Sequence, residues 1–149
     1  MEIVGYDAAH WPGIEEVHDL ARMQELRCGG LEGAFLPLAI AAEREELFDY
    51  CVYVALLEDK VAGFVAFTEE ELAWLYVHPA FQRQGIGRAL ARYAISRMKE
   101  GRKTVEVICG NEPARNLYRS LGFTKERIVH GLMPGNEAFK LSVWEMTME

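Results

Sequence analysis

Two nearby segments, LYVHP at residues 75–79 and QRQGIGR at residues 82–88, mark the turn that decides the fold. The stretch from Glu71 to Val77 is apolar on both alternating faces, which predicts a central strand covered on both sides of its sheet. Strict alternation would place Leu72, Trp74 and Tyr76 on one face and Glu71, Ala73, Leu75 and Val77 on the other. From Ile86 to Lys99, apolar residues recur at helical spacing. The loop therefore joins a central strand to the first turn of an amphipathic helix.

This loop has the properties of an anion site. The first turn of a helix has unpaired backbone N–H groups and the positive end of the helix dipole. Gly85 and Gly87 lack a Cβ, so phosphate oxygens could approach the backbone closely, and Arg83 and Arg88 add positive charge at the rim. Neither the dinucleotide fingerprint nor the phosphate loop of nucleotide hydrolases is complete here. The residues alone therefore leave two interpretations open, a phosphate site and a plain tight turn.

The other elements follow from hydrophobic periodicity and turn residues. Further strands are predicted over residues 1–6, 52–57, 61–67, 104–108, 123–130 and 137–146, and further helices over 11–27, 36–49 and 112–121. The order β-αα-βββ-α-β-α-ββ predicts an α/β protein, in three-layer α+β form, with helices on both faces of one mixed, mostly antiparallel sheet. We expect residues 1–149 to form a single domain.

Composition supports an ordinary globular chain. Half of the 149 residues are hydrophobic and 26% are charged, and no apolar run is long enough for a membrane-spanning helix. The start of the sequence lacks the pattern of a secretory signal. Cys28, Cys51 and Cys109 are far apart, so we expect reduced thiols, serving as core filler, in a cytoplasmic protein. No spacing typical of metal ligands is present.

Charge is distributed unevenly along the chain. Residues 1–77 carry 16 acidic and four basic side chains, whereas residues 78–149 carry seven acidic and 12 basic ones. The net charge of −7 argues against a nucleic-acid surface. The asymmetry is compatible with one surface for an anion and another for a cation, or with solvated helix faces only.

Together with a downstream stretch, the loop resembles the GNAT superfamily of acyl-CoA N-acyltransferases. Gln82-x-x-Gly85-x-Gly87 is similar to that family's pyrophosphate-binding motif. The family's closing signature is similar to Asn111-x-x-Ala114-x-x-Leu117-Tyr118-x-x-Leu121-Gly122-Phe123. One helix and one strand separate the two motifs, as in the family. Residues 1–50 match only in being two helices after a strand.

The resemblance implies acetyl-CoA as the donor and direct transfer of the acetyl group to an amine. It also implies that strands 71–77 and 104–109 splay apart, so that their free backbone groups pair with the pantetheine arm. The residues that it implies for cofactor binding are Leu75, Tyr76, Val77, Gln82, Arg83, Gln84, Gly85, Ile86, Gly87, Arg88, Asn111 and, with weaker support, Asn116.

Tyr118 is the candidate general acid. In the resembling family a tyrosine at this position protonates the departing thiolate. Its position four residues after Ala114 is also compatible with simple packing on one helical stripe.

Glu71 is the candidate general base for the proton that the amine loses. It lies 14 residues before Gly85, as in histone-acetylating members of the family, and partial burial at the strand end would raise its pKa. Two alternatives stay open. Glu71 could belong to a solvated acidic turn with Glu69 and Glu70, or ordered water could deprotonate the amine.

Three further residues near the motifs have less specific interpretations. Asn111 could orient the cofactor or cap the helix that begins at Glu112. His78 is expected at the surface beside Pro79. Cys109 is expected near the proposed acyl site, and the resemblance implies that it forms no acyl intermediate.

Two functions of different classes remain. The first is an N-acetyltransferase that acts on a cationic amine, either a small molecule or the lysine or N-terminus of a protein. The second is a non-catalytic acyl-CoA sensor or interaction module of the same fold. A homodimer is compatible with either function, and neither requires nucleic acid or a membrane.

Overall fold

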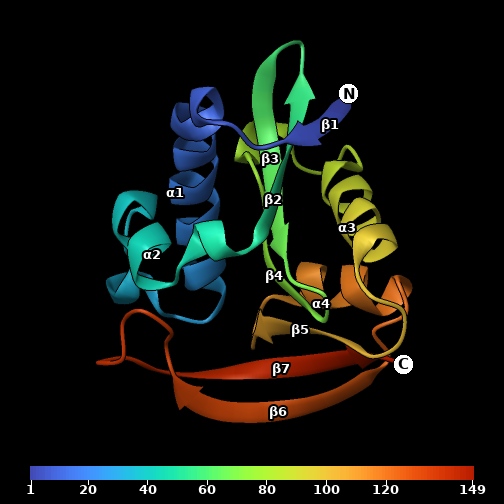
Figure 1. Ribbon diagram of the computed structural model, residues 1–149. Coiled ribbons are helices and arrows are strands. Elements are labelled where there is room, and N and C mark those ends of the chain that lie inside the picture. The colour runs from blue at the N-terminus through green and yellow to red at the C-terminus, as the bar shows by residue number, and fades with distance from the viewer.

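The computed structural model describes residues 1–149 and contains one seven-stranded sheet with the order β1-β2-β3-β4-β5-β7-β6 (Figure 1). Its strands are β1 (Glu2–Gly5), β2 (Cys51–Leu57), β3 (Lys60–Phe67), β4 (Glu71–Val77), β5 (Lys103–Ile108), β6 (Lys125–Leu132) and β7 (Lys140–Met148). Its α-helices are α1 (Trp11–Cys28), α2 (Leu38–Arg44), α3 (Ile86–Arg97) and α4 (Glu112–Ser120). Short 3-10 turns are η1 (Ala8–His10), η2 (Glu32–Ala34), η3 (Leu47–Asp49) and η4 (Pro79–Phe81). The mixed, mostly antiparallel architecture predicted from the sequence is confirmed.

The two largest hydrophobic cores lie on opposite faces of the sheet. On one face, α1 and α2 bury Ile14, Val17 and Leu38 against β3 and β4. On the other, α3 and α4 bury Leu90 and Tyr118. Fully burying one such aliphatic side chain contributes about 1.5–3 kcal/mol, so both helix layers are fixed to the sheet by packing. Figure 1 shows α1 and α3 on opposite sides of the central strands, with β6 at the edge of the sheet.

The only parallel pairing in the sheet is also the shortest, with two residue pairs. β4 pairs with β5 at Glu71–Thr104 and Leu72–Val105 and nowhere beyond. From Trp74 onward, β4 remains paired with β3, while β5 is paired with β7 through to Ile108. The two central strands therefore diverge along the rest of their length, in agreement with the expected splay.

A β-bulge at Ala73 changes which side chains of β4 share a face. Phe67 pairs with Leu72 and Ala66 with Trp74, so Ala73 has no partner in the ladder. Leu72 therefore packs with the α3 core, whereas Trp74 packs with the α1 core. The expectation that Leu72, Trp74 and Tyr76 share one face was wrong, because one extra residue in a strand inverts the alternation that follows it.

The bounds of the later elements also differ from the sequence-based expectation. The helix expected over residues 36–49 is shorter: α2 ends at Arg44, and Glu46 then adopts a left-handed conformation with φ 54°. A single helix could not follow this path, because the left-handed residue reverses the backbone before η3 buries Leu47. The final hairpin is shifted toward the C-terminus by about two residues at each strand. None of the helices has the length and hydropathy needed to cross a membrane.

Candidate active site

The loop between β4 and α3 presents its backbone N–H groups outward. Arg83 and Gly85 have left-handed φ angles of 63° and 84°, and Gly85 is the N-cap of α3 without any side-chain cap. The first α3 hydrogen bond that closes on this end runs from the Ala89 N–H to the Gly85 carbonyl oxygen, at 3.0 Å. The N–H groups of residues 86–88 precede that bond, so the helix leaves them free. Free N–H groups at a helix start, after left-handed residues, form a concave site that fits phosphate oxygens.

Gly87 faces the space between β4 and α4. A Cβ at this position would lie 3.6 Å from Val77 Cγ2 and 3.9 Å from Leu117 Cδ2, whereas one at Gly85 would meet nothing within 4 Å. Arg83 and Gln84 are exposed at the rim, and Arg88 is half-buried. The predicted loop residues are therefore gathered at the end of β4, next to α4.

The diverging strands leave backbone groups of β4 available. Leu75, Tyr76 and Val77 pair with β3 on one side and have no strand partner on the β5 side. An extended chain with amide groups, such as a pantetheine arm, could supply hydrogen bonds to this edge. Together, the loop fits the pyrophosphate of coenzyme A and the strand edge fits the amide groups of its pantetheine arm.

Tyr118 lies at the inner face of α4. Its side chain is buried, and its ring packs edge-on against Phe123 with centroids 5.8 Å apart. Burial, and then the negative charge of Glu25, raise the pKa of the Tyr118 hydroxyl above its usual value of 10. This hydroxyl makes no side-chain hydrogen bond within the chain. It is therefore free to donate a hydrogen bond to a group bound beside it.

Glu71 lies on the α1 face of the sheet. The bulge at Ala73 removes it from the face of Leu75 and Val77, which was the face expected from the sequence. Glu71 is half-buried, and this burial raises the pKa of its carboxyl group. A carboxylate with a raised pKa is a stronger base at neutral pH than an exposed one.

Sequence reasoning missed a second carboxylate beside it, Glu106 of β5. Glu71 pairs with Thr104, so Glu106 lies two residues further along the neighbouring strand and on the same face. Glu106 is exposed, but its partial desolvation in the sheet raises the pKa of its carboxyl group, and the negative charges of Glu71 and Glu145 raise it further. An acidic residue inside the strand predicted over residues 104–108 was the available signal, but only the strand order places it next to Glu71.

The surroundings of these two carboxylates are also acidic. Burial raises the pKa of Glu45, at the end of α2, to about 7, with Glu25 and Glu137 raising it and Arg22 opposing them. Burial, and then the charge of Glu71, raise the pKa of Tyr50. The α1 face therefore presents negative potential where the expected cationic acceptor would enter.

The remaining predicted residues have these positions. Asn111 caps α4, with its Oδ1 accepting from the Ala114 N–H at 3.4 Å, and Asn116 is exposed on α4. The side-chain amide of Gln82 donates to Val77 O at 3.1 Å and to Gln24 Oε1 at 2.7 Å. His78 Nδ1 accepts from the Ala80 N–H at 3.0 Å and so caps η4.

The expectation that the three cysteines fill the core was wrong. Cys28 and Cys51 are exposed and Cys109 is half-buried. Cys28 is the last residue of α1, and its backbone contacts Gly110 so closely that a Cβ there would lie 2.2 Å from Cys28 O. Cys51 begins β2 at the surface.

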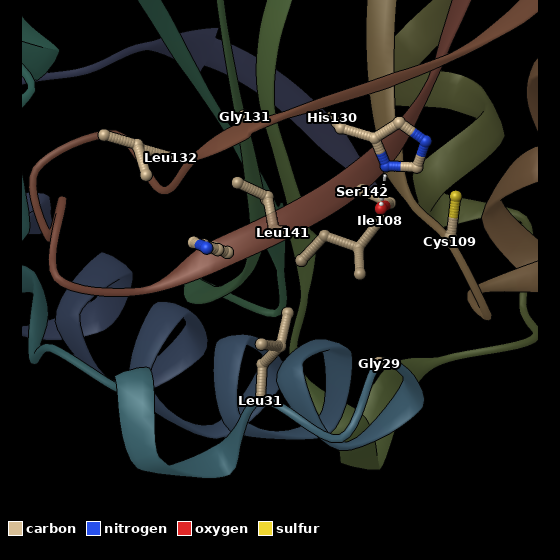
Figure 2. Close-up of a pocket in the computed structure, with 10 residues that line it drawn as sticks. Gly29, Leu31, Ile108, Cys109, His130, Gly131, Leu132, Leu141 and Ser142 are labelled. Atoms are coloured by element: carbon tan, nitrogen blue, oxygen red, sulfur yellow. Dashed lines mark hydrogen bonds between the residues drawn. The ribbon is translucent and has the colours of Figure 1, made fainter.

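A separate open pocket of about 590 Å³ lies where β5 ends (Figure 2). Its lining residues are Gly29, Leu31, Ile108, Cys109, His130, Gly131, Leu132, Lys140, Leu141 and Ser142. His130 Nδ1 and Ser142 Oγ are 2.6 Å apart at its rim, as Figure 2 shows. None of the predicted site residues lines this pocket.

The sequence matches the model of the acetyltransferase (GNAT) domain over residues 48–125. An uncharacterized protein of Mycobacterium leprae is 35% identical over 122 residues, 72% of this chain and 33% of the relative. The ribosomal protein bS18-alanine N-acetyltransferase of Escherichia coli is 39% identical over 82 residues, 50% of this chain and 55% of the relative. A peptidyl-lysine N-acetyltransferase of Escherichia coli is 37% identical over 67 residues, 44% of each chain. The matches therefore span about a third to about half of the curated relatives.

The fold is shared with solved structures over the whole chain. The ribosomal-protein-alanine N-acetyltransferase from Brucella melitensis superposes with a TM-score of 0.74 at 21% identity, covering 99% of this chain and 98% of that one. The matched family segment contains both Tyr118 and residues 82–88, which we call the phosphate-type loop. It spans more than half of the sequence. The protein belongs to the GNAT acetyltransferase family.

Proposed function

We propose that this protein is an N-acetyltransferase that moves the acetyl group of acetyl-CoA to a primary amine. The observation that carries the proposal is the free N–H groups of residues 86–88 beside the open edge of β4. Together they match a pyrophosphate joined to a chain with amide groups. Bound acetyl-CoA would supply a thioester carbon that an amine can attack.

The chain supplies the proton transfers. The amine nitrogen forms the new C–N bond, and the C–S bond breaks with its electron pair passing to sulfur. A carboxylate of the Glu71–Glu106 pair accepts the proton that nitrogen loses. The raised pKa of each carboxyl group favours this step, because an alkylamine of pKa about 10.4 arrives mostly protonated at neutral pH and must lose a proton before it attacks. The second proton, released when the C–N bond forms, passes to solvent.

Tyr118 supplies the other proton. Its free hydroxyl donates to the departing thiolate, and it recovers a proton from solvent. Because the raised pKa of Tyr118 keeps the phenol protonated at neutral pH, the proton is available when the thiolate forms. Asn111 contributes by fixing the start of α4, the helix that carries Tyr118.

The acceptor that we propose is an amine of a protein or peptide. The names of two curated relatives describe acetylation of an alanine of a ribosomal protein and of a peptidyl lysine. The acidic surroundings of Glu71 and Glu45 would favour a basic segment near the reacting amine. A small cationic amine meets the same charge requirement and is the second candidate.

Release of coenzyme A thiol tests these possibilities together. The panel contains a basic peptide with a free N-terminal alanine, the same peptide N-acetylated with one internal lysine, and spermidine. We expect thiol release with at least one of the peptides. Faster release with spermidine alone would assign a small-molecule acceptor. Binding of coenzyme A without thiol release for any amine would favour the sensor function instead.

A further inference from the structure

Only one polar side chain of the phosphate-type loop, residues 82–88, forms hydrogen bonds with the rest of the protein. Within residues 82–88, only Gln82 makes a side-chain hydrogen bond, and its amide nitrogen donates twice. One bond, to Val77 O at 3.1 Å, stays within the β4–loop segment. The other, to Gln24 Oε1 at 2.7 Å, reaches α1, 58 residues earlier in the chain.

α1 also borders the acceptor side of the sheet. Next to Gln24, Glu25 accepts a hydrogen bond from the Tyr76 hydroxyl at 2.9 Å and pairs with Arg22. Arg22 in turn contacts Met133 Sδ at 3.7 Å, in the connection between β6 and β7. The C-terminal half of α1 is therefore held between the acceptor side and the donor loop.

We propose that Gln24 is a positioning residue for acetyl-CoA. By accepting the second hydrogen bond of the Gln82 amide, it fixes the orientation in which residues 86–88 present their N–H groups, and it makes donor affinity depend on the placement of α1. The inference rests on the proposed function of the loop. Gln24 is exposed and touches no reacting group, so its effect passes entirely through Gln82.

The expected size of the effect is that of one neutral hydrogen bond. Such a bond changes an equilibrium by about 2–10-fold, because water competes for the same groups. Gln24→Leu should therefore raise the Kd of coenzyme A by about 2–10-fold. If the protein turns over an amine, the KM for acetyl-CoA should rise equally with kcat nearly unchanged, since this interaction is the same in the ground and transition states.

The experiment is calorimetric titration with coenzyme A of wild type, Gln24→Leu, Gln82→Leu and the double variant. Because Gln82→Leu already removes the bond to Gln24, the double variant should bind like Gln82→Leu alone. Leucine is a good helix former, so thermal stability should be preserved, and Gln24→Ala provides a second variant. Leu20→Ala, at an exposed position one turn earlier on α1, is the matched control and should bind like wild type.

Two results would overturn the positioning role: an unchanged Kd in both Gln24 variants, or losses that add in the double variant. If wild type itself does not bind coenzyme A, the proposed function and this inference fall together. If wild type binds coenzyme A but acetylates no amine, the proposed function fails on its own, and the four Kd values still decide the role of Gln24.

Discussion

Leu72 and Trp74 lie on opposite faces of the sheet although only one residue separates them in β4. The bulged residue between them, Ala73, lies just beyond the last residue of β4 that pairs with β5. The strand therefore has two functional halves. The half before the bulge holds Glu71 against β5, and the half after it diverges and exposes backbone groups.

The phosphate-type loop is testable at Gly87. Gly87→Val should raise the Kd of coenzyme A by more than about tenfold, because a branched side chain would occupy the narrow space between the loop, Val77 and Leu117. Gly87→Ala should fold normally, since its Cβ would make only ordinary contacts. Calorimetry measures both, and Gly131→Val on the edge strand β6, where a Cβ meets nothing within 4 Å, is the control. An unchanged affinity in Gly87→Val would mean that the donor binds elsewhere.

Tyr118 should act on the leaving group. Tyr118→Phe should lower kcat by about 100-fold and leave coenzyme A affinity nearly intact, because the hydroxyl is needed only when the thiolate departs. The fold should tolerate the change, since that hydroxyl has no hydrogen-bond partner within the chain and the ring keeps its contact with Phe123. Steady-state kinetics with the best amine gives the comparison, with Tyr93→Phe on α3 as control. If there is no pre-steady-state burst, product release does not limit the rate. Equal kcat values for wild type and Tyr118→Phe would then remove Tyr118 from the mechanism.

Variants of the two carboxylates should differ from wild type chiefly at neutral pH, well below the pKa of the amine. If Glu71 takes the proton from the amine, kcat/KM of Glu71→Gln should fall at neutral pH and recover as the pH approaches about 10, where the free amine is abundant. Glu106→Gln should show a smaller loss of the same form, because Glu71 stays in place as the base. A pH–rate profile for each variant tests this.

Salt distinguishes a base from a charge that merely attracts the acceptor. If the carboxylates act only by attraction, the loss appears in KM and shrinks at high ionic strength. Variant profiles that match wild type in height and shape at two salt concentrations would leave deprotonation to water. Either carboxylate could act as the base when the other is removed, so the double variant with Glu71→Gln and Glu106→Gln is the control.

Glu45 should make stability depend on pH. Its pKa is about 7 in the folded protein against an ordinary 4.5, so the unfolded chain ionises first as the pH rises, and stability is lost between these values. Glu45→Gln should therefore stabilise the fold at pH 8, by about 1 kcal/mol after solvent screening, and give no gain at pH 4. Thermal melts should show a rise of about 2–4 °C at pH 8 only. The exposed Glu43→Gln on the same helix should shift the melting temperature at neither pH, and an equal gain for both variants would contradict the prediction.

Much of the fold follows from local pattern. Glycines next to a helical repeat located the turn at residues 82–88, and periodicity gave the order of the elements, because both signals arise from neighbours along the chain. The position of Tyr118 on a short helix was predictable in the same way. The second helix was overextended because its spacing contained no sign of the left-handed Glu46.

The site on the acceptor side depends on contacts between distant segments. The sequence by itself determined which residues form the central strand and the loop, and that Glu71 begins that strand. Only the tertiary structure decided that a bulge turns Glu71 toward α1, that strand order brings Glu106 beside it, and that Gln24 meets Gln82. The physical reason is that alternation and helical spacing describe one element at a time. Register, bulges and contacts between elements are instead set by how two opposing cores pack on the same sheet.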